Sequence, residues 1–387
     1  MRQDYNPSVQ SLWQNPTENV HVKLEKRPQL NIAPMNRDAW KERALYLAIF
    51  CLLVVFYTMT RPLNHSESYD SLNYVLFAEN FALGTAPDSR NILFHAINRI
   101  VVVAAASLGF NVGTLELLTG ISILTGAMSL VLFARLMHKR FEVSAFSAWA
   151  GTVFLGLTYG YWRYCGAVEV YIPSIFLTLC SLSLIFRFLD DQARSTGSVV
   201  AAGVLSGLAV LYYQPNIVVL FIATFVLFCT KSRLLSFVLY SVAGAVVFIA
   251  GVVWSFMGVE ESTPSPSDLV GFVKARNGEF RERPSIGVAF VKIVLAFGHD
   301  LFSAHWTQTI DPVRNFLNPR IPGCVYNFQV AAHAGRGIQY LTAIGGILFS
   351  PLLYLFGRIH WLAASQWKSA RPGRPTLFLW RGWRYWG

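Results

Sequence analysis

The chain has 387 residues, of which 54% are hydrophobic and only 14% are charged. Soluble domains carry roughly a quarter charged residues, so this composition excludes an ordinary soluble protein and predicts a membrane protein with several spans. The formal net charge of +11 does not indicate a nucleic-acid partner, because Lys and Arg also collect on the cytoplasmic loops of membrane proteins. The five cysteines show neither a CxxC pair nor a metal-like spacing. The cofactor is unknown, and a divalent cation is an open option.

The chain begins with a polar segment, residues 1–43, that carries several Lys and Arg side chains. This composition predicts a disordered cytoplasmic tail. The apolar run 44–59 follows, and the leader before it is too long for a cleavable signal peptide. We expect this run to be a signal anchor, with the N-terminus in the cytoplasm.

Further apolar runs follow the first, and together they predict an all-α, polytopic transmembrane bundle of about eight spans, each close to the ~20 residues that a bilayer requires. Counted from an internal N-terminus, nearly every basic cluster falls on the inner side, as the positive-inside rule requires. The later runs cover residues 114–137, 144–161, 170–189, 198–213, 216–230, 234–257 and 338–356.

Between the first two spans the sequence predicts two helices that do not cross the membrane. Residues 69–83 place apolar and polar side chains on opposite faces, which is typical of an amphipathic helix on the membrane surface. Asp70 stands at its start, where a carboxylate either caps the free backbone N–H groups or acts in catalysis. Residues 91–110 are apolar enough for a span, but a span there would invert every later loop. We therefore predict an interfacial or re-entrant helix on the outer side.

These elements divide the chain into four parts. The tail 1–43 precedes a transmembrane core, residues 44–257, and residues 258–337 form an outer loop with interfacial helices. Residues 338–387 hold the last span and a basic cytoplasmic tail. On this topology the outer loops collect most of the polar side chains, while the inner loops carry basic anchors. The active site is therefore expected on the outer face of the core.

Three short segments carry a pattern that is informative through its order and spacing. In the first, Asp70 precedes a stretch with a proline and a short apolar helix. The second contains a tryptophan and then an acidic residue followed by Val-Tyr. The third ends an apolar helix at a polar turn. The segments are "LGTAPDSRNILFHAI" after Asp70, with Pro87, then "TYGYWRYCGAVEVYIPSIF", with Trp162, Glu169, Val170 and Tyr171, then "GLAVLYYQPNIVVL", with Gln214.

Together with the N-terminal span, these segments resemble the GT-C superfamily over residues 44–220. Its members are polytopic glycosyltransferases that use polyprenyl-phosphate-linked sugars, such as protein O-mannosyltransferases and bacterial lipid A sugar transferases. The resemblance implies a GT-C-like bundle in a bacterial inner membrane, surrounded by membrane lipids, with a protein, lipid or glycan as acceptor. The chain departs from the pattern in having Pro87 alone in place of paired prolines, in lacking the preceding His, and in matching nothing after residue 258.

The resemblance implies a role for each polar residue near the outer face. Asp70 would be the base that takes the proton of the acceptor, with Glu67 as its alternate or as an aid to metal binding. Arginine side chains would offset the charge of the leaving phosphate, because a guanidinium fork matches phosphate oxygens. The residues expected to bind the substrate are Glu169, Arg163, Tyr171, His95, Arg90, Arg99 and Gln214.

Several of these assignments have a structural alternative. Glu169 also suits an ion pair with Arg163, while Arg90 and Arg99 also suit contacts with lipid headgroups. His95 on an apolar helix also suits a hydrogen-bonded core position. For the whole chain, one alternative is a transporter or lipid flippase, a class that shows internal repeats and charged or broken helices at mid-membrane. Another is a shortened family member without catalysis.

Overall fold

The computed structural model describes the helical core of the chain and a few short pieces beyond it. The described residues are 37–61, 69–80, 91–141, 143–190, 195–229, 234–260 and 265–277, with short pieces at 287, 312, 315, 341–344 and 346–348. Within these ranges every regular element is a helix, as the sequence predicts. The chain divides into two compact units, Met1–Leu45 and Tyr46–Gly387. The described part of the first is the beginning of α1, and the second holds the rest.

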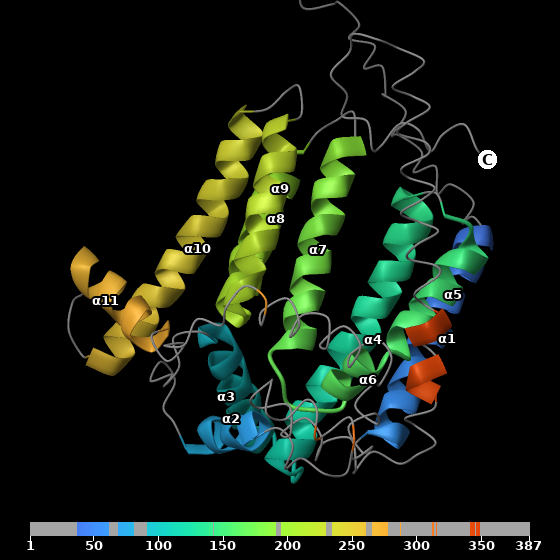
Figure 1. Cartoon of the computed structure of the whole chain (residues 1–387), viewed down its shortest axis with the longest axis horizontal. Coiled ribbons are helices and arrows are strands. Elements are labelled where there is room, and N and C mark those ends of the chain that lie inside the picture. Colours follow the sequence, from blue (N-terminus) through green and yellow to red (C-terminus); the bar gives the residue numbers. More distant parts are fainter. Residues whose placement is uncertain are drawn as a thin grey trace, which may run out of the picture. The chain divides into compact units, whose positions relative to one another are not determined.

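The helices follow the chain in the order expected of a polytopic bundle (Figure 1). They are α1 (Arg37–Thr60), α2 (Tyr69–Asn80), α3 (Ile92–Ser107), α4 (Thr114–Arg140), α5 (Ala145–Gly156), α6 (Tyr159–Cys165), α7 (Tyr171–Asp190), α8 (Thr196–Tyr212), the short 3₁₀ helix η2 (Gln214–Asn216), α9 (Ile217–Cys229), α10 (Leu234–Glu260) and α11 (Pro266–Asn277). The predicted tail therefore ends earlier than expected, since residues 37–43 belong to α1.

The chain is an integral membrane protein by the length and composition of its helices. Four helical segments are long and apolar enough to cross a bilayer: Trp40–Thr60, Thr114–Arg140, Tyr171–Leu189 and Leu234–Gly258. The shorter apolar helices are Ile92–Ser107, Ala145–Gly156, Thr196–Tyr212 and Gln214–Phe228. The predicted count of eight spans is therefore not confirmed, and most of the predicted last span, 338–356, lies outside the described residues.

The predicted span 144–161 is not confirmed as one continuous helix, because two helices replace it. Ser144 caps the first, α5, by accepting a hydrogen bond from the Ser147 N–H at 3.1 Å. Helix α5 has 12 residues and ends at Gly156. At a rise of 1.5 Å per residue, such a helix reaches only about 18 Å, short of the ~30 Å hydrocarbon core. The backbone is extended at Thr158, and α6 then starts in a new direction.

Hydrogen bonds with α1 stabilise the break between α5 and α6. The Tyr57 hydroxyl donates to the Gly156 carbonyl at 2.8 Å, where α5 ends. The Trp162 indole N–H donates to Thr60 Oγ1 at 2.9 Å, at the last residue of α1. Both rings are almost fully buried and belong to one apolar cluster. The end of α5 is thus fixed by contacts with a helix about a hundred residues earlier in the chain.

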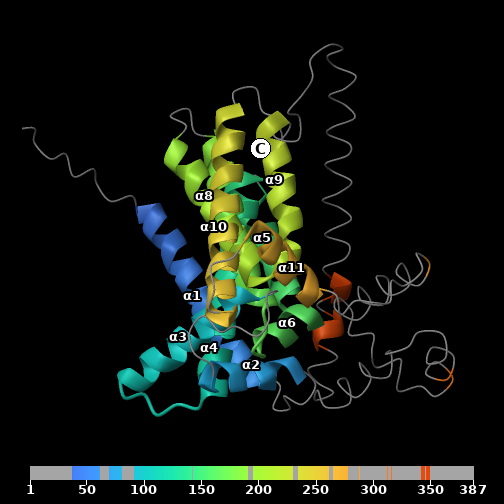
Figure 2. The ribbon, with the colours of Figure 1, turned by 90° about the vertical axis from the view of Figure 1, so that its left-hand side faces the viewer.

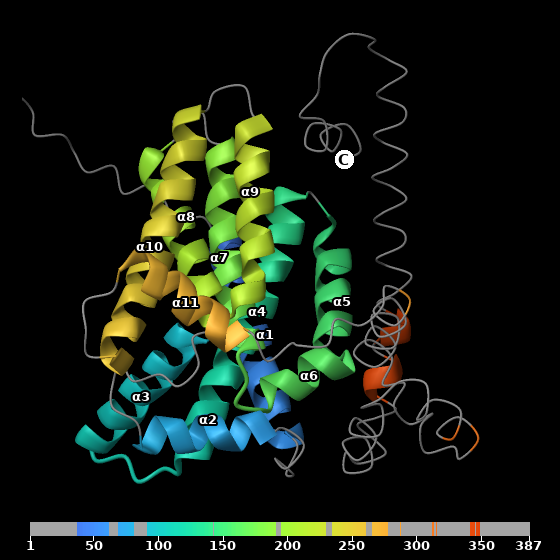
Figure 3. The same ribbon diagram turned by 60° about the vertical axis from the view of Figure 1, so that its left-hand side comes forward.

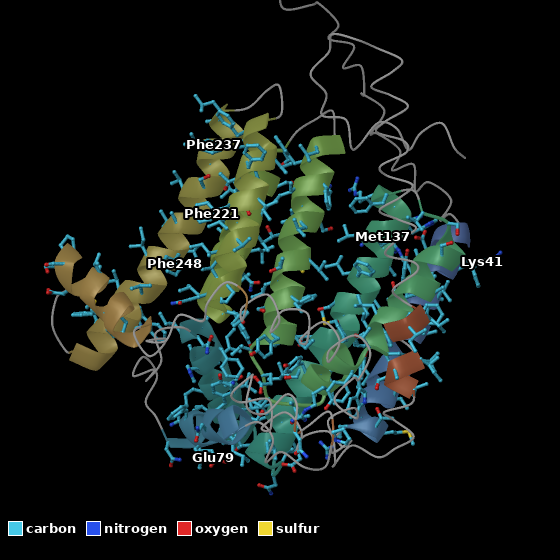
Figure 4. The ribbon with its side chains drawn as sticks, in the orientation of Figure 1. Lys41, Glu79, Met137, Phe221, Phe237 and Phe248 are labelled. Carbon is cyan, nitrogen blue, oxygen red and sulfur yellow. The ribbon has the colours of Figure 1, made fainter. Side chains whose placement is uncertain are left out.

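Helices α7, α8, α9 and α10 run alongside one another, and α4 packs against α7 (Figure 1). Glycines let α8 and α10 approach closely. A Cβ on Gly203 would collide with the Tyr240 carbonyl oxygen, and one on Gly207 would lie 2.7 Å from the Gly244 carbonyl oxygen. The outer faces of α9 and α10 are apolar, as the exposed Phe221 illustrates (Figure 4). Such faces suit contact with lipid.

A chain of three hydroxyl groups joins α7, α8 and α10 inside the bundle. Ser181 donates to the Ala202 carbonyl at 2.8 Å, so its single proton is used there. The Ser206 hydroxyl, 2.7 Å from Ser181 Oγ, must then donate to it. The Tyr240 hydroxyl, 2.6 Å away, donates in turn to Ser206. The protons of the three hydroxyl groups are thereby all used, which suits a hydrogen-bond chain surrounded by apolar side chains.

We expect Gly203→Ala to destabilise the bundle by about 1–3 kcal/mol, because the new methyl group meets backbone that cannot move aside. Gly120→Ala is the matched control: nothing lies within 4 Å of its Cβ position. That change should leave stability unchanged or raise it by up to about 1 kcal/mol. Thermal unfolding in detergent measures both, and equal effects would contradict the close packing of α8 and α10.

Helices α2 and α3 lie together at one end of the bundle, where they contact α4 and α8 (Figure 2). Helix α2 runs crosswise to α8 and α10 (Figure 3). The last turn of α4 carries His138, Lys139 and Arg140. Met137, just before them, lies at the opposite end of the bundle from Glu79 on α2 (Figure 4). The end that holds α2 and α3 is therefore distinct from the end that holds this basic cluster.

Candidate functional site

The candidate site is built around the connection between α6 and α7. This short connection is buried along most of its length, and Val168 and Val170 are 1% and 3% exposed. Glu169 lies between them and is only 6% exposed. A carboxylate in such a place is costly unless polar groups surround it. The buried carboxylate therefore makes this connection a candidate functional site.

The first turn of α2 contacts this carboxylate directly. The Ser71 hydroxyl lies 3.0 Å from the Val168 carbonyl oxygen and 3.3 Å from Glu169 Oε1. Ser71 is completely buried. The predicted base Asp70 immediately precedes it in α2, and the side chain of Asp70 lies outside the described part of the structure. The backbone thus brings the first and second predicted motif segments to one place.

Tyrosine rings from separate elements cluster beside the connection that carries Glu169. Tyr171, at the start of α7, has its ring centroid 4.6 Å from that of Tyr164 and 5.0 Å from that of Tyr213. The Tyr213 phenol forms a hydrogen bond with Tyr171 and lies within electrostatic reach of Glu169. The phenol groups of Tyr171 and Tyr213 are therefore near the carboxylate. Tyr213 follows α8, so the third motif segment also reaches the site.

Helix α3 contributes His95, which is buried among aromatic rings. Its ring centroid lies 5.5 Å from those of Tyr74, Phe77 and Phe94. Phe94 in turn packs edge-on against Tyr212 of α8. These contacts pack α3 against α2 and α8, and they place His95 beside the residues of α2. One turn further along, Asn98 is 3% exposed, and its side-chain N–H group meets no acceptor among the described residues.

Arg99, predicted to bind the substrate, contacts the last turn of α2. Its Nη1 donates to the Ala78 and Glu79 carbonyl oxygens at 3.0 and 2.8 Å. These carbonyls belong to the last turn of α2, which leaves such groups without partners inside the helix. The guanidinium group therefore closes the end of α2. These contacts support the helix, and the role of Arg99 at the phosphate stays a prediction.

We expect Arg99→Leu to lower the stability of the protein by about 1–2 kcal/mol, because two carbonyls lose a charged donor. Arg99→Lys is the matched variant: it keeps the charge but not the forked donor geometry, and should lose part of this amount. Thermal unfolding measures both. A variant with unchanged stability and a raised KM for the sugar donor would instead place Arg99 on the phosphate.

The other predicted residues divide into those near the site and those outside the described structure. Arg163 is buried on α6, which leads directly into the connection that carries Glu169. Gln214 begins η2 and directly follows Tyr213. Glu67 and Arg90 lie outside the described residues. Among the residues that the structure describes, no group of three or more His, Cys, Asp or Glu side chains could hold a metal ion.

Sequence reasoning missed Ser71 and, among the clustered tyrosines, assigned a role in the site to Tyr171 alone. On α2 the apolar Leu72 and Leu76 are exposed, whereas Ser71 and Ala78 are buried. The buried face of α2 is thus formed by small residues, which a search for large apolar side chains overlooks. The tyrosines had a visible signal, because Tyr164, Tyr171 and Tyr213 all fall in or beside the motif segments.

No protein-family model matches this chain, and no curated protein matches its sequence. Among solved structures, the chain is similar to the crystal structure of ArnT from Cupriavidus metallidurans bound to undecaprenyl phosphate, with 16% sequence identity and a TM-score of 0.47. The match covers 84% of this chain and 64% of ArnT, so the chain spans less than two thirds of that protein. A likeness at this level carries no functional weight, and we base the function on contacts within the chain.

Proposed function

We propose that this protein is a GT-C-like membrane glycosyltransferase. It transfers a sugar from a polyprenyl-phosphate donor to an acceptor hydroxyl at the outer face of a bacterial inner membrane. The observation that carries the proposal is the contact of Ser71 with Val168 and Glu169. Two segments that resemble different GT-C motifs, and that lie far apart in the sequence, meet there.

The proposed reaction is a displacement at C1 of the donor sugar. The Asp70 carboxylate takes the proton of the acceptor hydroxyl as its oxygen forms a bond to C1. The bond between C1 and the phosphate oxygen breaks, and its electron pair leaves with the polyprenyl phosphate. Asp70 suits this role by its position in the chain. The first turn of α2 lies against Glu169, and Tyr171 of the tyrosine cluster is two residues after Glu169.

The remaining polar residues serve to bind the donor. Arg163, which is buried beside the connection, and Arg90 supply positive charge for the leaving phosphate. Glu169, Tyr171, His95 and Gln214 line the sugar and acceptor positions. Glu67 is the alternate base or an aid to a divalent cation. The prenyl tail stays with the membrane lipids along the apolar faces of the helices.

The experiment is a transfer assay with the purified protein in lipid vesicles, supplied with a polyprenyl-phosphate sugar that is labelled in the sugar. We expect the label to move to acceptors from a membrane extract. A transporter or flippase predicts the opposite: the label crosses the vesicle membrane without a glycosylated product. That outcome would contradict the proposal. Addition of a chelator in a parallel reaction tests whether a divalent cation takes part.

A further inference from the structure

The hydroxyl group of Ser71 lies between two acceptors that belong to consecutive residues. The Val168 carbonyl oxygen is 3.0 Å away and Glu169 Oε1 is 3.3 Å away. A serine hydroxyl has a single proton, so it serves the two acceptors as a shared donor. One of them is a fixed backbone atom and the other is a carboxylate on a rotatable side chain. The hydroxyl therefore ties the carboxylate to its own backbone.

The surroundings make this link strong. Ser71 is fully buried and Glu169 nearly so, which keeps bulk water from competing for the carboxylate. Hydrogen bonds to a charged group in such a place are stronger than those between neutral groups. Glu169 also lies beside the first turn of α2, where the helix dipole favours a negative charge. The carboxylate is thus held against the helix turn that carries Asp70.

Helix α2 is itself held at both ends. At its start, Ser71 contacts Val168 and Glu169, and at its end, Arg99 donates to the Ala78 and Glu79 carbonyls. These contacts come from two different parts of the chain, the α6–α7 connection and α3. Because both ends of α2 are held, the orientation of the Glu169 carboxylate is coupled to the position of the first turn of α2.

We propose that Ser71 is a positioning residue, whose hydroxyl orients the Glu169 carboxylate toward the first turn of α2 for the transfer reaction. This role rests on the proposed function. Ser71 itself takes no part in bond making; it acts through Glu169. Removal of its hydroxyl should therefore affect the rate of the transfer step and leave donor binding largely intact.

The test is a double-mutant cycle with Ser71→Ala, Glu169→Gln and the double variant, measured as kcat and KM in the vesicle transfer assay. We expect Ser71→Ala to lower kcat roughly 10-fold, since a hydrogen bond to a charged group is lost, while KM changes by less than about 2-fold. The double variant should be no slower than Glu169→Gln alone, because Ser71 acts only through that carboxylate. Multiplicative losses in the double variant would overturn the proposal.

Two more variants separate this role from a general packing effect. Ser129→Ala is the matched control: it is a buried serine whose hydroxyl donates to the Thr125 carbonyl of its own helix, and its kcat should stay within about 2-fold of wild type. Ser71→Cys keeps the size of the side chain but is a weaker donor. It should lose part of kcat, and serves in place of Ser71→Ala if that variant does not fold. Full activity of Ser71→Cys together with Ser71→Ala would overturn the role.

Failure of the proposed function is recognised separately, because wild-type protein then transfers no sugar. In that case wild type, Ser71→Ala, Glu169→Ala and their double variant are compared by their thermal unfolding midpoints, because Glu169→Ala removes the acceptor that Glu169→Gln keeps. A shift in the double variant smaller than the sum of the single shifts supports the Ser71–Glu169 coupling. Additive shifts overturn it, whatever reaction the protein performs.

Discussion

Asp70→Asn is expected to abolish sugar transfer, with a loss of about 10²–10⁴-fold in kcat, the usual contribution of a positioned general base. Asparagine has the shape of aspartate but cannot accept the proton of the acceptor hydroxyl. It is also an effective residue at helix N-termini, so a role of Asp70 in capping α2 would survive the change. The variant therefore separates the two readings that the sequence leaves open. Transfer kinetics and thermal unfolding of the same preparation measure them.

The matched control for this variant is Asp268→Asn at the start of α11. Asp268 accepts hydrogen bonds from the Ser265 backbone N–H at 2.9 Å and from its hydroxyl at 2.6 Å, and these hold the pKa of the carboxyl below its usual range. It is a capping carboxylate with no part in the site. We expect the control to transfer sugar at the wild-type rate. Equal activity of Asp70→Asn and Asp268→Asn would remove Asp70 from the mechanism.

Glu169→Gln should give the second largest loss, roughly 10- to 100-fold in kcat, because the buried carboxylate that we propose contacts the substrate loses its charge while its shape is kept. Glutamine still accepts a hydrogen bond from Ser71, so the connection between α6 and α7 should fold as before. The assay is the same transfer reaction, with kcat and KM determined separately. Retained thermal stability is the expected companion result.

Glu79→Gln provides the control for the second variant. Glu79 is an exposed acid in the last turn of α2, whereas Ser71 lies in its first turn. Its loss of charge should change kcat by no more than about 2-fold, as for most surface substitutions. If Glu169→Gln behaves like this control, the buried carboxylate serves the fold alone. The alternative reading of Glu169, as a structural residue, would then be correct.

The sequence predicts those helices of this protein whose formation depends on the pattern of residues within the helix itself. The amphipathic pattern of α2 and the long apolar run of α4 each depend on residues within one helix, and both helices form near the predicted positions. The resemblance of the motif segments to the GT-C pattern also implies that α2 belongs near the α6–α7 connection. Ser71 does lie against that connection, next in the chain to Asp70.

The sequence does not predict features that are determined by contacts between residues far apart in the chain. The run 144–161 is apolar throughout, so its pattern cannot reveal a break that Tyr57 and Trp162 hold through hydrogen bonds to and from α1. The same limit applies to Arg99, whose partners on α2 are twenty residues away. The role of Ser71 was hidden for another reason: a small hydroxyl residue in a helix has no distinctive pattern. Only its contact with Glu169 makes it visible.

The central claim is that the start of α2 and the α6–α7 connection form one site for a prenyl-linked sugar. The most direct test uses a polyprenyl-phosphate sugar that carries a photoreactive diazirine beside the phosphate. After irradiation in vesicles, the labelled peptides are mapped by mass spectrometry, with unmodified donor as competitor. We predict competable label within residues 69–80 and 159–171. Competable label confined to the end of the bundle that holds His138, Lys139 and Arg140 would contradict the account.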